Sequence, residues 1–180
     1  MAKLAPILLA EDDPNDAFLF ACAVKHAGVP NPCVVMRDGQ QTIDFLELLS
    51  SCPDRWQHPL PAVLLLDLKM PRLSGFDVLA WLQTRADLQS MPVVVLSSSP
   101  QAPDMLKSRE LGAVDYQVKP SRLEDLVALI QQLRARWLQP KAAITDSSSL
   151  RVAPPQLPSA RPAAVVVRQA RNRAIEPQPA

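Results

Sequence analysis

The sequence predicts a doubly wound α/β domain, in which a five-stranded parallel sheet carries helices on both faces. Two observations predict it: apolar segments of strand length recur between residues 7 and 118, and segments with helical start and stop signals lie between them. The apolar segments are continuous rather than alternating, as expected for strands buried on both faces of a parallel sheet. Parallel neighbours need crossover connections, which cover both faces with helices.

The predicted strands come first, and each is a short run dominated by aliphatic residues. They are residues 7–10, 33–36, 62–66, 93–96 and 114–118. Between the second and third strands, residues 50–61 contain three prolines and are expected to form a surface loop.

The helices between these strands are indicated by their ends. Asp13 followed by Pro14 predicts the start of the first helix, and Gly28 predicts its end near residue 27. Ser121 and Glu124 predict a capping box at the start of the last helix. That helix has an apolar stripe at helical spacing, made of Leu123, Leu126, Val127, Ile130, Leu133 and Trp137.

Composition divides the chain into a domain, residues 1–139, and a tail, residues 140–180. The tail has seven prolines, no glycine, six basic residues and two acidic residues. It cannot bury enough apolar surface to offset its ordering entropy, so we expect a disordered basic tail. Because the formal charge of the whole chain is +1, the domain is acidic and the small total hides two regions of opposite sign.

Charge and apolar run length exclude several classes of protein. The near-neutral total gives no general attraction to nucleic acid or to an anionic membrane. The longest apolar run, residues 17–24, is far shorter than the roughly 20 residues of a membrane span. Proline and acidic residues interrupt the N-terminal apolar stretch, unlike a secretory signal, so we expect a cytoplasmic protein. Three cysteines without paired spacing indicate neither a disulfide framework nor a zinc site.

Polar residues directly follow four of the predicted strands. They are Glu11 and Asp12, Asp67, Ser97, and Lys119. The carboxyl ends of parallel strands form one edge, where ligands of doubly wound sheets bind, so these side chains should converge. Clustered carboxylates without nearby histidine or cysteine favour Mg²⁺ or Mn²⁺ over zinc. A lysine and a hydroxyl beside a cation suit a phosphoryl group, which is either bound or transferred to Asp67 as the nucleophile.

Four segments of the sequence together resemble the signature of a known family. They are ILLAEDDPND, LLLDLKMPRLSGF, VVVLSSS and DYQVKP. In this order and spacing they resemble the receiver domain of response regulators in two-component signalling, over about residues 7–138. The PND sequence, the long loop before the third strand and VLSSS are most similar to stand-alone receivers of the phytochrome-associated type. The resemblance implies a flavodoxin-like strand order, 2-1-3-4-5.

The resemblance also implies roles for individual residues. Asp67 would be the phosphoacceptor, and Glu11, Asp12, Asp67 and the backbone carbonyl of Lys69 would bind Mg²⁺. Ser97 and Lys119 would contact phosphoryl oxygens, with a cis peptide bond between Lys119 and Pro120. Tyr116 would be an aromatic switch that turns inward when Ser97 moves toward the phosphoryl group.

By the same resemblance the protein would be a phosphoacceptor that catalyses its own phosphorylation and dephosphorylation. Its partner would be a sensor histidine kinase or a phosphotransfer protein. The face made by the fourth helix, fifth strand and fifth helix would read out the phosphorylation, with homodimerisation through this face as a further hypothesis. We expect no direct nucleic-acid contact, because the tail is too short and proline-rich for a DNA-binding domain.

The same residues disfavour three other functions. A dehalogenase-type phosphatase needs an acid two residues after its nucleophile, where Lys69 stands, and a Rossmann module needs a glycine-rich turn where EDDPND stands. A receiver that serves only as a scaffold is disfavoured by the intact acidic set. Whether the protein delivers a signal or drains phosphate from a branched pathway stays open.

Overall fold

A computed structural model of the chain describes residues 3–54 and 57–138. Its strands form one five-stranded parallel sheet in the order β2-β1-β3-β4-β5. The strands are β1 (Ile7–Ala10), β2 (Cys33–Met36), β3 (Val63–Leu66), β4 (Val93–Ser97) and β5 (Asp115–Val118). The predicted fold class and strand order are therefore confirmed, and each predicted strand matches an observed strand to within one residue at either end.

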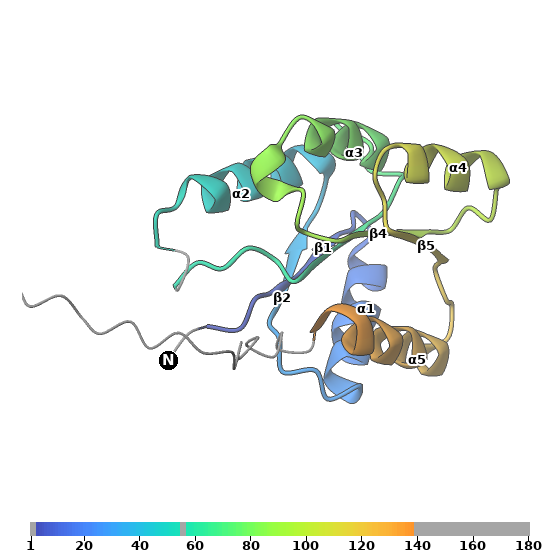
Figure 1. Ribbon diagram of the computed structural model, residues 1–180. Coiled ribbons are helices and arrows are strands. Elements are labelled where there is room, and N and C mark those ends of the chain that lie inside the picture. The colour runs from blue at the N-terminus through green and yellow to red at the C-terminus, as the bar shows by residue number, and fades with distance from the viewer. Residues whose placement is uncertain (1–2, 55–56, 139–180) are drawn as a thin grey trace, which may run out of the picture. The chain divides into compact units, whose positions relative to one another are not determined.

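Helices cover both faces of the sheet (Figure 1). They are α1 (Pro14–His26), α2 (Gly39–Ser51), α3 (Gly75–Gln83), α4 (Ala102–Glu110) and α5 (Leu123–Leu133), with a 3-10 turn at Ala86–Leu88 and a π-helical turn at Arg134–Leu138. Helices α1 and α5 lie on one face, and α2, α3 and α4 lie on the other. The predicted loop starts at residue 52 rather than 50, because α2 continues to Ser51.

The central strands are apolar throughout because each of their faces belongs to a different core. In β1, Ile7 and Leu9 pack with the core under α1 and α5. Leu8 and Ala10 point to the opposite face and pack with the core under α2 and α3. All four side chains are almost completely buried. A strand that serves two cores has no polar face, which explains the continuous apolar run in the sequence.

The first helix begins and ends where the sequence predicted. The Asp13 carboxylate accepts hydrogen bonds from the backbone N–H groups of Asn15 (2.7 Å) and Asp16 (3.3 Å), and these bonds hold the pKa of Asp13 below its usual range. Gly28 follows the last turn with φ of +61°, a left-handed conformation that glycine adopts without a steric penalty. The Asp13 cap therefore starts α1 at the carboxyl edge of β1, and Gly28 ends the helix where the chain turns toward the start of β2.

The last helix confirms the predicted apolar stripe but not the predicted capping box. Leu126, Ile130 and Leu133 are buried in the core shared with α1. The helix starts at Leu123 with Arg122 at the N-cap, and no side chain caps it in the described part of the chain. The prediction was wrong because Ser121 lies one residue too early for its hydroxyl to reach the first free backbone N–H groups.

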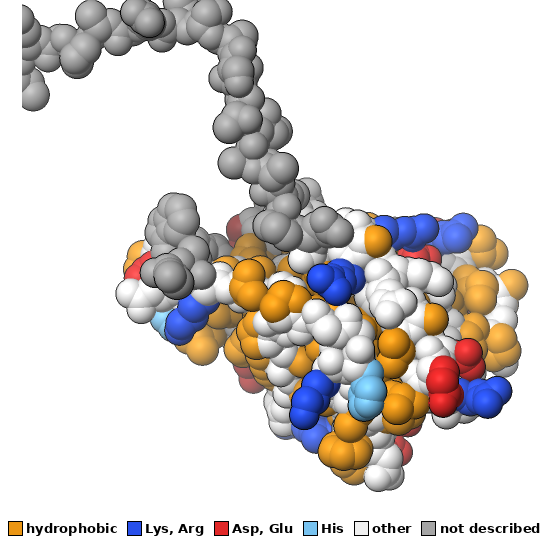
Figure 2. Space-filling view, turned by 90° about the horizontal axis from the view of Figure 1, so that it is seen from below, with side chains coloured by type: hydrophobic (Ala, Val, Ile, Leu, Met, Phe, Trp, Pro, Cys, Tyr) orange, Lys and Arg blue, Asp and Glu red, His pale blue; other side chains and the backbone are white. Residues whose placement is uncertain are grey.

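The remaining predictions about organisation concern the surface and the tail. Among residues 3–54 and 57–138, no helix has the length and apolarity of a membrane span. Figure 2 looks onto the face of α1 and α5, where basic side chains lie apart from one another rather than in a continuous basic surface. The predicted tail, residues 140–180, lies outside the described residues.

Candidate functional site

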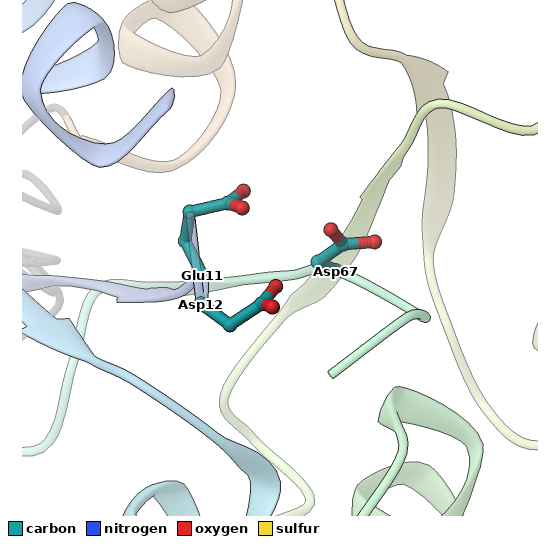
Figure 3. Close-up of side chains that lie close together, drawn as sticks. All are labelled: Glu11, Asp12 and Asp67. Carbon is teal, nitrogen blue, oxygen red and sulfur yellow. The ribbon is translucent and has the colours of Figure 1, made fainter. Parts of the chain in front are cut away.

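Three carboxylates meet at the carboxyl edge of the sheet, as the sequence predicted. Glu11 and Asp12 follow β1, and Asp67 follows β3. Backbone bonds fix both turns, since Glu11 N–H donates to the Met36 carbonyl (2.9 Å) and Asp67 N–H donates to the Ala10 carbonyl (3.0 Å). One oxygen from each carboxylate lies within 4.8 Å of the others, and Figure 3 shows the three groups pointing into a common space. Glu11 and Asp67 are buried there, with 2% and 5% of their surface exposed, whereas Asp12 is exposed.

Lys119 brings a positive charge into this cluster from the end of β5. Its backbone N–H donates to the Ser97 carbonyl (2.9 Å), which directs the side chain across the sheet edge. Its Nζ lies 2.6 Å from Glu11 Oε2, 2.6 Å from Asp67 Oδ2 and 3.2 Å from Asp16 Oδ2. The ammonium group therefore has three carboxylate partners, one for each of its hydrogens.

Burial and pairing act in opposite directions on the ionisation of these groups. Burial lowers the pKa of Lys119, but the bonds to Asp67 and Glu11 outweigh it and raise that pKa above its ordinary value. For Glu11, burial dominates and raises the pKa above 4.5, although the bond to Lys119 partly offsets this. Pairing therefore favours the charged form of Lys119, whereas burial disfavours the charged form of Glu11.

The donor set fits a hard divalent cation. The Lys119 ammonium group pairs with the carboxylates of Glu11, Asp16 and Asp67, and the Asp12 carboxylate lies beside those of Glu11 and Asp67, so negative charge remains in excess. Oxygen ligands and excess negative charge suit Mg²⁺ or Mn²⁺. The Lys69 backbone N–H donates to Asp67 Oδ1 (3.1 Å), and the Lys69 side chain is exposed. The role of the Lys69 carbonyl as a metal ligand stays a prediction.

The predicted hydroxyl and aromatic side chains lie on the β4–β5 side of this edge. Ser97 is fully buried at the end of β4, and its Oγ accepts the Ser99 N–H (3.2 Å). Tyr116 is buried in β5, where it is paired in register with Val95. Its hydroxyl donates to the Ser99 carbonyl at 2.7 Å, so the ring is turned inward and holds the loop that leads to α4.

One predicted feature of the site was wrong. No peptide bond in residues 3–54 or 57–138 is cis, so the bond between Lys119 and Pro120 is trans. The trans form has the lower free energy even before proline, by about 0.5–1 kcal/mol.

Several residues that complete the site were not predicted from the sequence. Asp16 lies in the first turn of α1, and its position at the start of a helix on the carboxyl edge is a signal that could have found it. Gly75 starts α3 directly against β3: a Cβ there would lie 2.2 Å from the Asp67 carbonyl oxygen, so only glycine allows this approach. Neither Asp38 nor Arg72 was predicted, although they form an ion pair beside the loop that follows Asp67.

Comparisons with known proteins agree with this geometry. A profile of the response regulator receiver domain matches residues 7–131. The response regulator Rcp1 of Synechocystis sp. is 33% identical over 133 residues, which cover 74% of this chain and 88% of Rcp1. The crystal structure of the Mn²⁺-bound form of Rcp1 gives a TM-score of 0.63 at 32% identity, covering 75% of this chain and 95% of that chain. The phosphorylated cyanobacterial phytochrome response regulator RcpA gives 0.65 at 30% identity, covering 76% of this chain and 95% of that chain.

Proposed function

Because the chain belongs to the response regulator receiver family, we propose that it accepts a phosphoryl group on Asp67 from a sensor histidine kinase or a phosphotransfer protein. The observation that carries this proposal is the convergence of Glu11, Asp12, Asp67 and Lys119 at one edge of the sheet. The resemblance to Rcp1 and RcpA assigns the chain to the phytochrome response regulator group within the family.

The acidic cluster is the proposed site of a bound Mg²⁺. Glu11, Asp12 and Asp67 would hold it together with the backbone carbonyl of Lys69. When bound, the cation supplies positive charge that offsets the charge of the transferring phosphoryl group. Support comes from the all-oxygen donor set and from the relative Rcp1, whose structure has been determined in an Mn²⁺-bound form.

Phosphoryl transfer would proceed by in-line attack of one Asp67 oxygen on the phosphorus of the donor phosphohistidine. The P–O bond forms as the P–N bond breaks, and the leaving imidazole keeps the electron pair of that bond and takes up a proton. Lys119 Nζ already lies 2.6 Å from Asp67, so a small movement would bring it to a phosphoryl oxygen. Attack by water on the phosphorus of the acyl phosphate would break the P–O bond to Asp67, release inorganic phosphate and return Asp67 to its free carboxylate.

The phosphorylated state would be read out on the face of α4, β5 and α5. Ser97 Oγ would donate a hydrogen bond to a phosphoryl oxygen, and Tyr116 would act as the switch residue, held inward by the Ser99 carbonyl. Exposed apolar side chains on this face, Leu106 and Val118, suit contact with a partner or with a second copy of the chain. Light scattering with and without a phosphoryl mimic tests dimerisation, and a monomer in both states would contradict it.

The Lys69 side chain is proposed to set the lifetime of the phosphoryl group. It is exposed two residues beyond the phosphoacceptor, where it could contact the group or exclude attacking water. Lys69→Ala should change the rate of autodephosphorylation, and an unchanged rate would remove this role.

Intact-mass measurement tests the proposed function. Wild type and Asp67→Asn are incubated with Mg²⁺ and a small acyl phosphate donor. We expect one added phosphoryl group on wild type and none on Asp67→Asn. Equal labelling of the two proteins, or none on a folded wild type supplied with a cognate kinase, would contradict the proposal.

A further inference from the structure

The loop between β3 and α3, residues 67–74, carries the phosphoacceptor at its start and is closed at its base. Gly75 N–H donates to the Leu68 carbonyl (3.0 Å), so the end of the loop is bonded back to its start, two residues after β3. Lys69, within the loop, donates its backbone N–H to Asp67. Any displacement of this loop would therefore move the phosphoacceptor carboxylate and the Lys69 backbone together.

The apex of the same loop is fastened to the start of α2. Arg72 forms an ion pair with Asp38, whose side chain is only 3% exposed. Gly39 N–H donates to the Leu73 carbonyl (3.2 Å), and a Cβ on Gly39 would lie 2.3 Å from that carbonyl oxygen. The loop and the helix thus approach more closely than any residue other than glycine would allow.

Asp38 uses both carboxylate oxygens, each for a different element. Oδ1 accepts the Gln41 N–H (2.8 Å) and caps α2, while Oδ2 pairs with Arg72. Arg72 is the only cation paired with Asp38 in the described ranges, and a buried carboxylate without a cation is strongly destabilised. Arg72 has φ of +63°, a left-handed conformation that costs free energy for any residue other than glycine.

The segment that carries Asp38 also contacts the turn that carries Glu11. Glu11 N–H donates to the carbonyl of Met36, the last residue of β2 and only two residues before Asp38. The segment from Met36 to Asp38 therefore contacts the Glu11 turn on one side and the Arg72 loop on the other.

We propose that Asp38 and Arg72 are a positioning pair that fixes the β3–α3 loop relative to the Glu11 turn, and thereby sets the spacing of the acidic cluster for cation binding. This inference rests on the proposed function, because it assigns a task to that same site. Neither residue is among the proposed ligands of the cation or of the phosphoryl group. Residues of this kind, which hold ligands in place, commonly change metal affinity by 10- to 100-fold when they are replaced.

Four variants separate the pair from its surroundings. Asp38→Asn keeps a side chain that caps α2 but removes the charge. Arg72→Gln removes the cation, Arg72→Lys keeps it, and Arg72→Gly relieves the left-handed backbone while removing the side chain. The matched control is Arg85→Gln, because Arg85 also forms an ion pair with α2, at Glu47 (3.3 Å). Glu47 lies one turn from the C-terminal end of α2, whereas Asp38 caps its N-terminal end.

The measurement is the Mg²⁺ dissociation constant by calorimetry, at a temperature where circular dichroism shows every variant folded. We expect Asp38→Asn, Arg72→Gln and Arg72→Gly to raise it about tenfold. Arg72→Lys should restore most of the affinity, and Arg85→Gln should stay close to wild type. The double variant Asp38→Asn/Arg72→Gln should lose no more than either single variant, because both remove the same interaction.

Phosphorylation from a small acyl phosphate gives a second readout that a general loss of stability would not produce. The variants should be slow at low Mg²⁺ and should approach the wild-type rate at saturating Mg²⁺. Wild-type affinity in Asp38→Asn and Arg72→Gln, an equal loss in Arg85→Gln, or a loss in only one member of the pair would overturn the inference. Failure of wild type itself to take a phosphoryl group would instead overturn the proposed function.

Discussion

The two halves of the carboxyl edge are built differently. On the β1–β3 side, two glycines bring backbone segments into contact, Asp38 caps α2, and α3 has a complete capping box between Ser74 and Asp77. On the β4–β5 side, α4 buries only Ser108 among its nine residues, and neither α4 nor α5 has a side-chain cap in the described ranges. The β1–β3 half therefore has close backbone contacts and side-chain caps on its helices, whereas the β4–β5 half has uncapped helices and little burial of α4.

This difference matches the division of labour that we propose. Cation binding and in-line attack need oxygens at fixed spacing, which close packing supplies. A switch needs an element that moves at low cost, and such elements come from the less stable parts of a structure. On the β4–β5 side, the Tyr116 hydroxyl donates to the Ser99 carbonyl and so ties β5 to the loop before α4, and the Ser99 hydroxyl donates to Asp104 of α4 (2.7 Å).

Lys119 is the side chain that joins the two halves, so Lys119→Met should have the largest effect on the metal-free protein. The change leaves two buried carboxylates, Glu11 and Asp67, without their cation. We expect a loss of about 3 kcal/mol in the free energy of unfolding, measured by urea denaturation. Mg²⁺ should stabilise the variant more than wild type, because the cation replaces the missing charge. A variant as stable as wild type would show that the lysine does not balance the cluster.

Packing on the β1–β3 half is tested by Gly75→Ala. The added Cβ would meet the Asp67 carbonyl at 2.2 Å, so the backbone must shift, and we expect a loss of about 2 kcal/mol by urea denaturation together with weaker Mg²⁺ binding. The control is Gly112→Ala beyond α4, where φ is +90° but no described atom lies within 4 Å of the new Cβ. That variant should lose stability through its backbone alone and keep wild-type affinity for Mg²⁺. Equal effects on Mg²⁺ binding would contradict the proposed asymmetry.

The hydrogen bond from Tyr116 to the Ser99 carbonyl, on the β4–β5 half, is tested by Tyr116→Phe. Loss of the hydrogen bond to the Ser99 carbonyl should cost about 1 kcal/mol and should speed amide hydrogen exchange in the loop before α4. The affinity for Mg²⁺ should not change. If exchange accelerated equally near Asp67, the halves would not be independent.

Burial of the Glu11 carboxylate, on the β1–β3 half, predicts a small dependence of folding stability on pH. The pKa of Glu11 is raised above 4.5 in the folded protein, mainly by burial, so its protonated form favours folding. That contribution is present below pH 4.5 and is lost as the pH rises through the raised pKa. The stability of Glu11→Gln relative to wild type should therefore increase as the pH rises from 4 to 7 without Mg²⁺, as measured by urea denaturation at each pH. A difference that does not depend on pH would show that burial does not control this carboxylate.

Features that depend on a few neighbouring residues could be predicted from the sequence, whereas features that depend on distant contacts could not. Continuous apolar runs and the Asp13 cap act within a few residues, and the family predicted from the four motifs is confirmed by the match over residues 7–131. The convergence of Glu11, Asp67 and Lys119 followed from the parallel topology alone. The pairing of Asp38 with Arg72 depends on how closely α2 approaches a distant loop, which no local pattern encodes. The Ser121 capping box failed because it required the helix start to be known to a single residue.

Hydrogen exchange before and after addition of Mg²⁺ and a phosphoryl mimic such as beryllium fluoride tests the division most directly. We predict that Mg²⁺ alone slows exchange around Asp67 and the β3–α3 loop. The mimic should then change exchange mainly from β4 through α4 to β5. Changes of equal size in α2 and α3, with α4 unaffected, would contradict the division into a fixed half and a mobile half.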